Sequence, residues 1–322
     1  MSPPIDNTQS LSTEATTLID EFKALCVKNG FNDFRKEENT DETTILRFLR
    51  AQRYDVGSAF QQFHYFQTWR RANNIRVFYE HLDVETYDES RKMYPQWIGR
   101  RDQDGRPVYV FQVRQLTKKK LDSYLYMLAA APRPSSHSGS DIPIYILHLH
   151  ALHEASYLGI HTHCGHQQCQ HPSILEHSQV LQEASKIATA HYPETLGRVF
   201  VVGAPAFFKS VWDAISQWFD PETRLKIFIL SLSESKSFLL SHVDASDLPK
   251  EYGGELDWQW QDQPNLDEST RRLVDDLYHK TDRGEIFPKG PIIYQDSCIR
   301  LVGSVDGSPR HNAFCRIATP SL

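Results

Sequence analysis

The sequence predicts an α/β protein in which an all-helical N-terminal domain precedes a domain with a mixed, mostly parallel β-sheet. The first observation is helical periodicity of apolar residues up to about residue 79. The second is a set of short apolar runs that alternate with amphipathic helical segments after residue 96, a pattern typical of strands buried in a largely parallel sheet. We therefore expect a flexible tail, a helical domain, an α/β domain and a C-terminal extension, at residues 1–13, 14–95, 96–260 and 261–322.

The N-terminal domain is expected to consist of packed helices. Asp41 is the predicted N-cap of a helix whose apolar face is Ile45, Leu46, Phe48 and Leu49. After Asp55, aromatic residues recur at every third position, which indicates a second helix packed into a core; they are Phe60, Phe63, Phe66 and Trp69. Basic residues lie on the other side of the first helix, where we expect solvent, at positions 47, 50 and 53.

Three strands and two helices are predicted in the second domain. The turn sequence at 102–107 contains Asp-Gly followed by Arg-Pro and introduces a strand at 108–113, in which residue types alternate. Continuous apolar runs at 199–202 and 227–230 predict two buried strands. Helical stripes lie at 180–188 and 208–219, and a short helical pattern follows near residue 273. From residue 303 on we expect little regular structure.

Composition and charge exclude several classes of protein. The 35 basic residues are outnumbered by 41 acidic ones, whereas a protein that binds nucleic acid without sequence preference is usually basic. Five cysteines spread over 322 residues are a poor disulfide framework and suit a reducing compartment. No signal peptide is visible, and no apolar stretch approaches the ~20 residues of a membrane span. We therefore expect a cytoplasmic protein without a nucleic-acid partner.

Sequence motifs of common enzymes are missing. The chain has no nucleophile elbow, no phosphate-binding glycine loop, no dinucleotide fingerprint and no His-Glu-x-x-His zinc motif, so we predict neither enzymatic activity nor a cofactor. A tract rich in His and Cys at 161–171 offers the ligand types that zinc prefers. Because these residues form one crowded segment instead of two separated knuckles, we expect no metal there, and a zinc-stabilised module is an alternative that metal analysis tests.

A helix with an unusually wide apolar stripe follows the Gly-Ala-Pro sequence at 203–205. Its members are Phe208, Val211, Trp212, Ile215 and Phe219. One interpretation is a buried packing helix. The other is a helix that covers an apolar cavity and also contacts a membrane, where Trp and Phe suit the interface. On the turn that follows, Thr223 and Lys226 are three residues apart and therefore share a face, where they form a candidate small anion site.

Several motifs together resemble the CRAL-TRIO family, and most of all the fungal phosphatidylinositol/phosphatidylcholine transfer proteins of the secretory-pathway type. The helical motif Thr-Ile-Leu-Arg-Phe-Leu-Arg-Ala-Gln-Arg-Tyr-Asp at 44–55 resembles the N-terminal domain of this family. Further motifs resemble its lipid-binding domain and lie at 94–95, 102–109, 192–197, 220–230 and 248–254. The resemblance implies a sheet that forms the floor of an apolar pocket for one phospholipid, and a mobile gate helix at 206–219.

The resemblance also implies the site residues. The inositol-phosphate site maps onto Glu194, Thr223 and Lys226. A basic residue that the family uses is replaced here by Gln52, so Arg53 next to it is the candidate substitute. The lipid pocket maps onto Tyr109, which matches a tyrosine linked to phosphatidylcholine, and Phe111. A second tyrosine position holds Ile98, which favours phosphatidylinositol over phosphatidylcholine.

The chain departs from the family pattern at 137–176, where a short strand, a loop and a helix are expected. Either residues 144–149 replace that strand, or the tract is an alternative or mistranslated segment. In both cases the hydroxyl groups that the family contributes from this strand have no assigned counterpart.

These observations predict a monomeric cytosolic protein that encloses a phospholipid, with phosphatidylinositol expected and phosphatidylcholine second. It would exchange this lipid transiently at endoplasmic reticulum, Golgi or endosomal membranes. The alternative is a lipid-responsive scaffold or regulator that binds lipid without transferring it.

Overall fold

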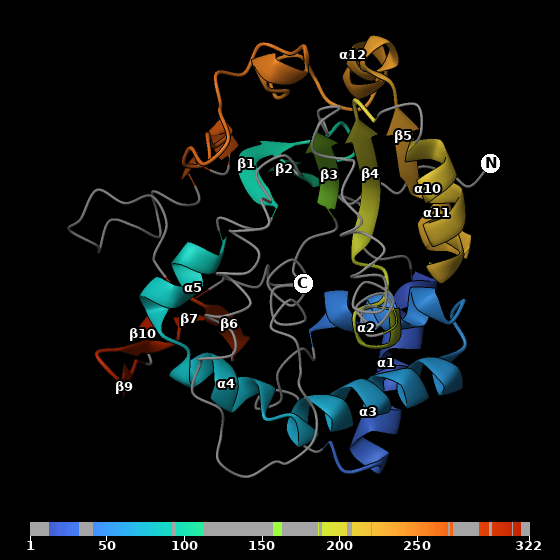
Figure 1. The fold of residues 1–322 in the computed structure, drawn as a ribbon. Helices are drawn as coiled ribbons and strands as arrows, with labels where there is room; N and C mark the ends of the chain where they lie inside the picture. The colour runs from blue at the N-terminus through green and yellow to red at the C-terminus, as the bar shows by residue number, and fades with distance from the viewer. Residues whose placement is uncertain are drawn as a thin grey trace.

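The computed structural model describes residues 13–31, 41–91, 95–112, 157–162, 186, 189–204, 208–219, 221–269, 271–272, 290–295, 298–310 and 312–316. Within these ranges the helices of the N-terminal part lie at one end of the molecule and a five-stranded sheet lies at the other (Figure 1). A smaller sheet from the C-terminal part lies beside the helices. The predicted order, helical domain first and α/β domain second, is confirmed.

The N-terminal part consists of five helices. They are α1 (Thr13–Lys28), α2 (Glu42–Ala51), α3 (Val56–Ala72), α4 (Ile75–His81) and α5 (Val84–Arg91). The carboxylate of Asp41 accepts a hydrogen bond of 2.9 Å from the amide of Thr44, which confirms the predicted N-cap of α2. Asp55 caps α3 in the same way through the amide of Ser58, at 2.6 Å.

Aromatic side chains form the core of this helical part. Phe22, Phe48, Phe63 and Phe66 are fully buried. The ring of Phe63 makes edge-to-face contacts with Phe22 and Phe48 at centroid distances of 5.4 and 5.3 Å, a geometry that the ring quadrupoles favour. Two members of the predicted stripe are thus core residues, whereas the other two, Phe60 and Trp69, are only partly buried at its rim.

The main sheet is mixed and mostly parallel. Its strands are β1 (Gln96–Arg101), β2 (Pro107–Gln112), β3 (Tyr157–Thr162), β4 (Leu196–Val202) and β5 (Ile227–Leu230), and their spatial order is the order of the sequence. The β1–β2 pair is antiparallel, and the other three pairs are parallel. The three predicted strands appear as β2, β4 and β5, with a shift of one residue in β2 and an earlier start in β4.

The position between β2 and β4 is filled by β3, at residues 157–162. The strand suggested at 144–149 therefore does not take this place in the sheet, and those residues lie outside the described ranges. Most of the helix expected at 180–188 also lies outside them, although residues 189–191 are helical.

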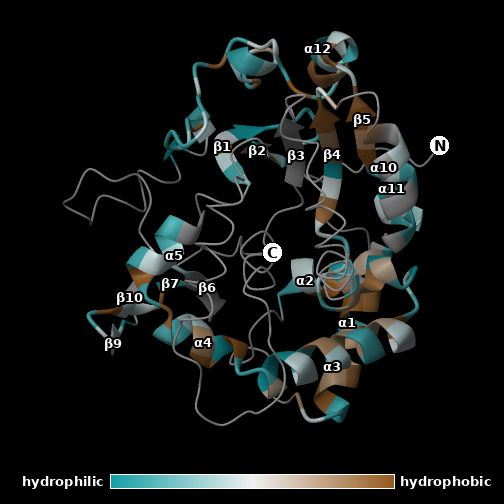
Figure 2. Ribbon diagram, viewed as in Figure 1, coloured by the Kyte–Doolittle hydropathy of each residue, from teal (hydrophilic) through white to brown (hydrophobic). Residues whose placement is uncertain are grey.

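One face of the sheet is covered by the segment that follows β5. This segment begins with α12 (Leu232–Leu240) and continues through the short η3 (Lys250–Tyr252). The sheet residues in this core are Ile98, Val108, Val110, Phe200, Val202 and Leu230, and they pack with Leu239, Val243 and Leu248. Figure 2 shows β5 and most of β4 in the colour of hydrophobic residues, which agrees with their place in this core. The helices α10 (Phe208–Ile215) and α11 (Pro221–Leu225) lie beside β5 at the end of the sheet (Figure 1).

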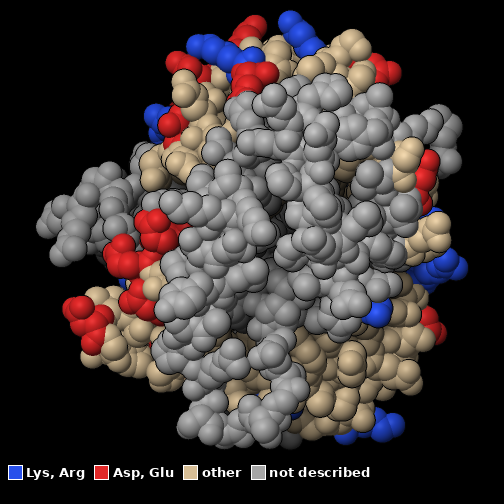
Figure 3. Space-filling view, viewed as in Figure 1, with Lys and Arg blue, Asp and Glu red and all other residues tan. Residues whose placement is uncertain are grey.

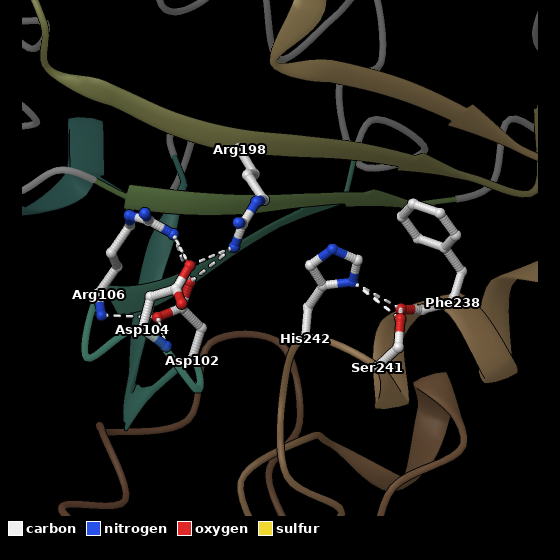
Figure 4. Close-up of polar contacts among 7 residues, drawn as sticks. All are labelled: Asp102, Asp104, Arg106, Arg198, Phe238, Ser241 and His242. Atoms are coloured by element: carbon white, nitrogen blue, oxygen red, sulfur yellow. Dashed lines mark hydrogen bonds and ion pairs between the residues drawn. The ribbon is translucent and has the colours of Figure 1, made fainter. Parts of the chain in front are cut away.

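A partly buried charge network, in which only the Asp102 side chain is fully buried, joins the β1–β2 turn to β4 (Figure 4). The guanidinium of Arg198 donates a hydrogen bond of 2.6 Å to Asp104, and Arg106 contacts both Asp102 and Asp104. Burial raises the pKa of Asp104, but the hydrogen bonds from Arg198 and Arg106 outweigh it, so the pKa lies below its usual value. The Asp-x-Asp-Gly-Arg-Pro turn is thus held against β4.

The C-terminal extension contains regular structure that the sequence analysis did not anticipate. A three-stranded antiparallel sheet is formed by β6 (Ile292–Gln295), β7 (Cys298–Leu301) and β10 (Asn312–Arg316). A hairpin of β8 (Ser304–Val305) and β9 (Ser308–Pro309) turns at Asp306 and Gly307, both with positive φ. The expectation of little structure after residue 303 is wrong, because Asp-Gly is a strong hairpin sequence. The amide of Ser304 also donates to the carbonyl of Leu82, at 2.8 Å, which fixes the hairpin to the N-terminal part.

Candidate functional site

The structure brings together two of the predicted site residues, Glu194 and Lys226. The Nζ of Lys226 donates a hydrogen bond of 3.1 Å to Oε2 of Glu194, across 32 residues of sequence. The Lys226 and Glu194 side chains are 26% and 27% exposed, so the pair is half-buried. Glu194 has a φ of 54°, a conformation that few non-glycine residues adopt.

Strands β4 and β5 fix the position of this pair. Glu194 precedes β4 by two residues, and Lys226 directly precedes β5. The carbonyl of Lys226 accepts a hydrogen bond of 2.8 Å from the amide of Val199 in β4. The pair therefore lies where two neighbouring parallel strands begin, with its backbone held by the sheet.

Thr223 precedes Lys226 by three residues, but α11 ends at Leu225, so the sharing of one helix face by the two side chains stays a prediction. Thr223 is in α11, and its carbonyl accepts a hydrogen bond of 3.0 Å from the amide of Lys226. Thr223 is half-buried, whereas the residues directly after it, Arg224 and Leu225, are exposed. A hydroxyl, an ammonium and a carboxylate in one region offer donors and acceptors for a polyol or a phosphate group.

The predicted substitute cation, Arg53, is exposed and forms no ion pair with the described residues. Instead, Gln52 points into the fold. Its Nε2 donates a hydrogen bond of 2.8 Å to Oε1 of Gln62 on α3. The Nε2 of Gln62 in turn donates to the carbonyls of Thr189 and Ala190, at 3.2 and 3.1 Å. An amide chain therefore links the helical part to the segment that leads to Glu194.

Tyr109 and Phe111 lie on the face of the sheet opposite the α12 core. Burial alternates along β2, with Val108 and Val110 buried and the two aromatic residues half-buried. Strand register places half-buried Val201 of β4 and Ile229 of β5 on the same face. The ring of Phe111 also contacts Trp260, at a centroid distance of 6.1 Å. These residues give the sheet a second, half-buried apolar face, and its role as the floor of a lipid pocket stays a prediction.

The predicted gate helix is shorter than expected. The α-helix covers Phe208–Ile215, and residues Ser216–Trp218 form a 3₁₀ turn instead of continuing it. Phe208, Trp212 and Phe219 are half-buried, and the rings of the last two stack at 5.9 Å. Val211 and Ile215 belong to the helix, but their side chains lie outside the described part of the chain.

His191, which the sequence analysis did not single out, is buried close to the site. Its ring stacks on Trp69 at 4.3 Å and on Tyr65 at 5.0 Å, both from α3. Burial lowers the pKa of His191 to about 4, and its Nδ1 has no hydrogen-bond partner among the residues that the structure describes. The only sequence signal was its place directly before Tyr-Pro-Glu, which does not distinguish it from a solvated histidine.

No cluster of three or more potential metal ligands occurs among the residues that the structure describes. Of the His/Cys tract at 161–171, only residues 161 and 162, at the end of β3, belong to the described residues. Within the described ranges, no helix is long and apolar enough to cross a membrane. Figure 3 shows acidic side chains gathered at the left of one face, over α5 and the β8–β9 hairpin, and charges of both signs at the top and right.

Comparison with known proteins agrees with this fold. The family model of the CRAL/TRIO N-terminal domain matches residues 18–64, and that of the CRAL/TRIO domain matches residues 163–254. A solved structure titled "Crystal structure of Sfh5" aligns with a TM-score of 0.52 at 16% identity, over 83% of this chain and 98% of that chain. This likeness concerns the fold alone.

Curated relatives match most of the chain. The SEC14 cytosolic factor of Kluyveromyces lactis is 30% identical over 76% of this chain and 80% of its own length. That of Eremothecium gossypii is 29% identical over 77% and 79%. The Arabidopsis thaliana phosphatidylinositol/phosphatidylcholine transfer protein SFH7 is 27% identical over 78% of this chain and 45% of its length. The chain therefore belongs to the CRAL/TRIO family, together with the SEC14 cytosolic factors.

Proposed function

We propose that this protein binds one phospholipid, with phosphatidylinositol as the expected ligand, and transfers it between membranes. The observation that carries this proposal is the Glu194–Lys226 pair at the start of β4 and β5. It supplies polar contacts for a headgroup, while the half-buried apolar face of the same sheet supplies a wall for acyl chains. An amphiphile needs both kinds of surface.

The physical chemistry of lipids explains why a carrier is needed. Each CH₂ group moved out of water contributes about 0.8 kcal/mol, so two acyl chains with about 30 methylenes lose roughly 24 kcal/mol when they leave a bilayer bare. Spontaneous exchange is therefore slow. A protein that encloses both chains removes most of this barrier, provided that its pocket opens at the membrane and closes in water.

We propose α10 as the gate of this pocket. Phe208 and Trp212 are half-buried and thus lie between core and solvent, and such aromatic residues suit a membrane interface. Ile98, which the resemblance placed at a second pocket-tyrosine position, is instead fully buried in the α12 core, on the face of the sheet opposite Tyr109 and Phe111. The preference for phosphatidylinositol is therefore proposed from the Glu194–Lys226 pair and not from Ile98. The names of the curated relatives, cytosolic factors and transfer proteins, support a cytosolic carrier that is not an enzyme and needs no cofactor. The protein would be a monomer that contacts endoplasmic reticulum, Golgi or endosomal membranes transiently. We propose the domain boundaries that the sequence predicts, at residues 1–13, 14–95, 96–260 and 261–322.

A vesicle assay tests this function. Donor vesicles contain labelled phosphatidylinositol or phosphatidylcholine, and acceptor vesicles contain neither label. We expect faster transfer of phosphatidylinositol, and mass spectrometry of the purified protein should find it bound. Bound lipid without transfer would favour the scaffold alternative, and a protein that neither binds nor transfers phospholipid would refute the proposal.

A further inference from the structure

The amide chain from Gln52 through Gln62 ends on the segment that carries the candidate headgroup site. Gln62 lies on α3 and donates to the carbonyls of Thr189 and Ala190, which are 127 and 128 residues away in the sequence. Glu194 follows only four residues later. The chain is therefore a direct connection between the helical part and the site.

The orientation of the Gln62 amide is determined by its partners. Carbonyl oxygens only accept hydrogen bonds, so the NH₂ group of Gln62 must face Thr189 and Ala190. Its oxygen then points toward Gln52, whose NH₂ group donates to it at 2.8 Å. Both glutamine side chains are half-buried. Gln52 thus fixes the rotation of the Gln62 amide, and Gln62 fixes the backbone.

The held backbone needs such support, because Glu194 has a positive φ of 54°. A residue in this region is strained unless its surroundings over-determine it. Packing on the same helix supplies further constraints, since His191 stacks on Trp69 and Tyr192 packs edge-on against Phe66 at 5.6 Å. The stacked rings can still slide along each other. The hydrogen bonds from Gln62 are directional and therefore fix the positions of the Thr189 and Ala190 carbonyls.

We infer that Gln62 is a positioning residue for the headgroup site, aligned by Gln52. It holds residues 189–194 so that the carboxylate of Glu194 meets Lys226. Gln52 stands where the family has a basic residue. Its neutral amide orients Gln62 and supplies no charge to the lipid phosphate. This inference rests on the proposed function of the Glu194–Lys226 pair.

The test replaces Gln62 by Met, which has similar length but cannot form these hydrogen bonds. The matched control is Gln61→Met, because Gln61 is the exposed neighbour on the same helix. Three quantities are measured for each protein: the rates of phosphatidylinositol and phosphatidylcholine transfer, the hydrogen exchange of the backbone amides of Tyr192, Glu194 and Thr195 (Pro193 has none), and the thermal midpoint.

In Gln62→Met we expect faster amide exchange at 192–195 and about tenfold slower phosphatidylinositol transfer, as expected for two weakened hydrogen bonds. Phosphatidylcholine transfer should change little, since its headgroup lacks inositol hydroxyls. Gln61→Met should behave like the parent. Gln52→Met removes only the hydrogen bond that orients the Gln62 amide, so it should change the same quantities by a smaller factor. It replaces Gln62→Met as the test variant if Gln62→Met does not fold.

Other outcomes overturn the inference. An equal loss of both transfer rates together with a lower thermal midpoint would show that Gln62 is merely structural. An unchanged lipid ratio or unchanged exchange at 192–195 would show that it does not position the site. If the parent transfers neither lipid, the proposed function fails, whereas the exchange measurement still decides whether Gln62 holds the segment.

Discussion

The imidazole of His191 lies nearly parallel to the indole of Trp69, with ring centroids 4.3 Å apart and planes 17° apart. This contact joins α3 to the turn that leads to Glu194. His191 is only 2% exposed, and burial lowers its pKa to about 4. The folded protein therefore holds this histidine neutral at pH values where the unfolded chain protonates it.

This contact predicts a loss of stability in mild acid. Below about pH 6.5 His191 binds a proton in the unfolded chain but not in the folded protein. The free energy of unfolding therefore falls as the pH drops toward about 4. The slope reaches about 1.4 kcal/mol per pH unit, and the full effect is about 3 kcal/mol. Urea unfolding at pH 7 and pH 5 measures it.

His191→Phe keeps an aromatic ring and removes the titrating group. Between pH 7 and pH 5 we expect its free energy of unfolding to fall by about 2 kcal/mol less than that of the parent. His64→Phe is the control, because His64 is an exposed histidine on α3. If His191→Phe keeps the full pH dependence of the parent, other groups cause the acid sensitivity.

Removal of either charge at the proposed headgroup site should reduce phosphatidylinositol transfer selectively. Glu194→Gln and Lys226→Met keep the size of the side chains, and each removes a charged hydrogen bond that contributes about 1.5–3 kcal/mol, or roughly ten- to a hundredfold in affinity. The thermal midpoint should change little, because a half-exposed ion pair stabilises a fold by at most about 1 kcal/mol.

The control for this pair is Arg224→Gln, which removes an exposed charge on α11 two residues before Lys226. The vesicle assay with both lipids measures the effect. Phosphatidylinositol transfer at the parent rate in both site variants would refute the assignment of Glu194 and Lys226.

Gly254 is expected to be essential for stability. A Cβ atom at this position would lie 2.0 Å from the carbonyl oxygen of Leu248, and that oxygen accepts a hydrogen bond of 3.0 Å from the amide of Leu256. Since backbone cannot rotate away as a side chain does, Gly254→Ala should destabilise the fold by about 1–3 kcal/mol. Thermal unfolding measures this.

A second glycine provides the comparison. Gly57 lies in α3, where an added Cβ would meet only a side-chain atom of Asp55 at 3.6 Å. Gly57→Ala should therefore leave the thermal midpoint unchanged or raise it, because alanine favours a helix. A Gly254→Ala protein as stable as Gly57→Ala would show that the 248–256 loop adapts without cost.

Local patterns explain which elements could be predicted from the sequence. The strands β2, β4 and β5 have apolar runs, and the cap at Asp41 has its own residue preference, so each is determined by neighbouring residues. The β8–β9 hairpin was also predictable, because Asp306 and Gly307 form an Asp-Gly turn. It was missed because strands of two residues have no period to detect.

The interdomain contacts at the site could not be predicted in this way. Gln61 and Gln62 are the same residue type on consecutive positions of α3, yet the first is exposed and the second binds carbonyls more than 100 residues away. Nothing local distinguishes them. The burial of His191 likewise depends on a helix from the other part of the chain. The resemblance to a family located Glu194 and Lys226, but it did not indicate what holds them.

The last prediction concerns α10 as a gate. Phe208→Asp and Trp212→Asp together should block vesicle transfer more strongly than they lower the thermal midpoint. Both side chains are half-buried, so the closed protein can keep their charged replacements partly in water. Opening at a bilayer would bring those charges into the interface, which is unfavourable.

Ser210→Asp is the matched control, since it adds a charge at an exposed position of the same helix. A folded, soluble protein without transfer supports the gate. Aggregation or loss of cooperative unfolding would show instead that the helix is part of the core, where unpartnered charges cost several kcal/mol.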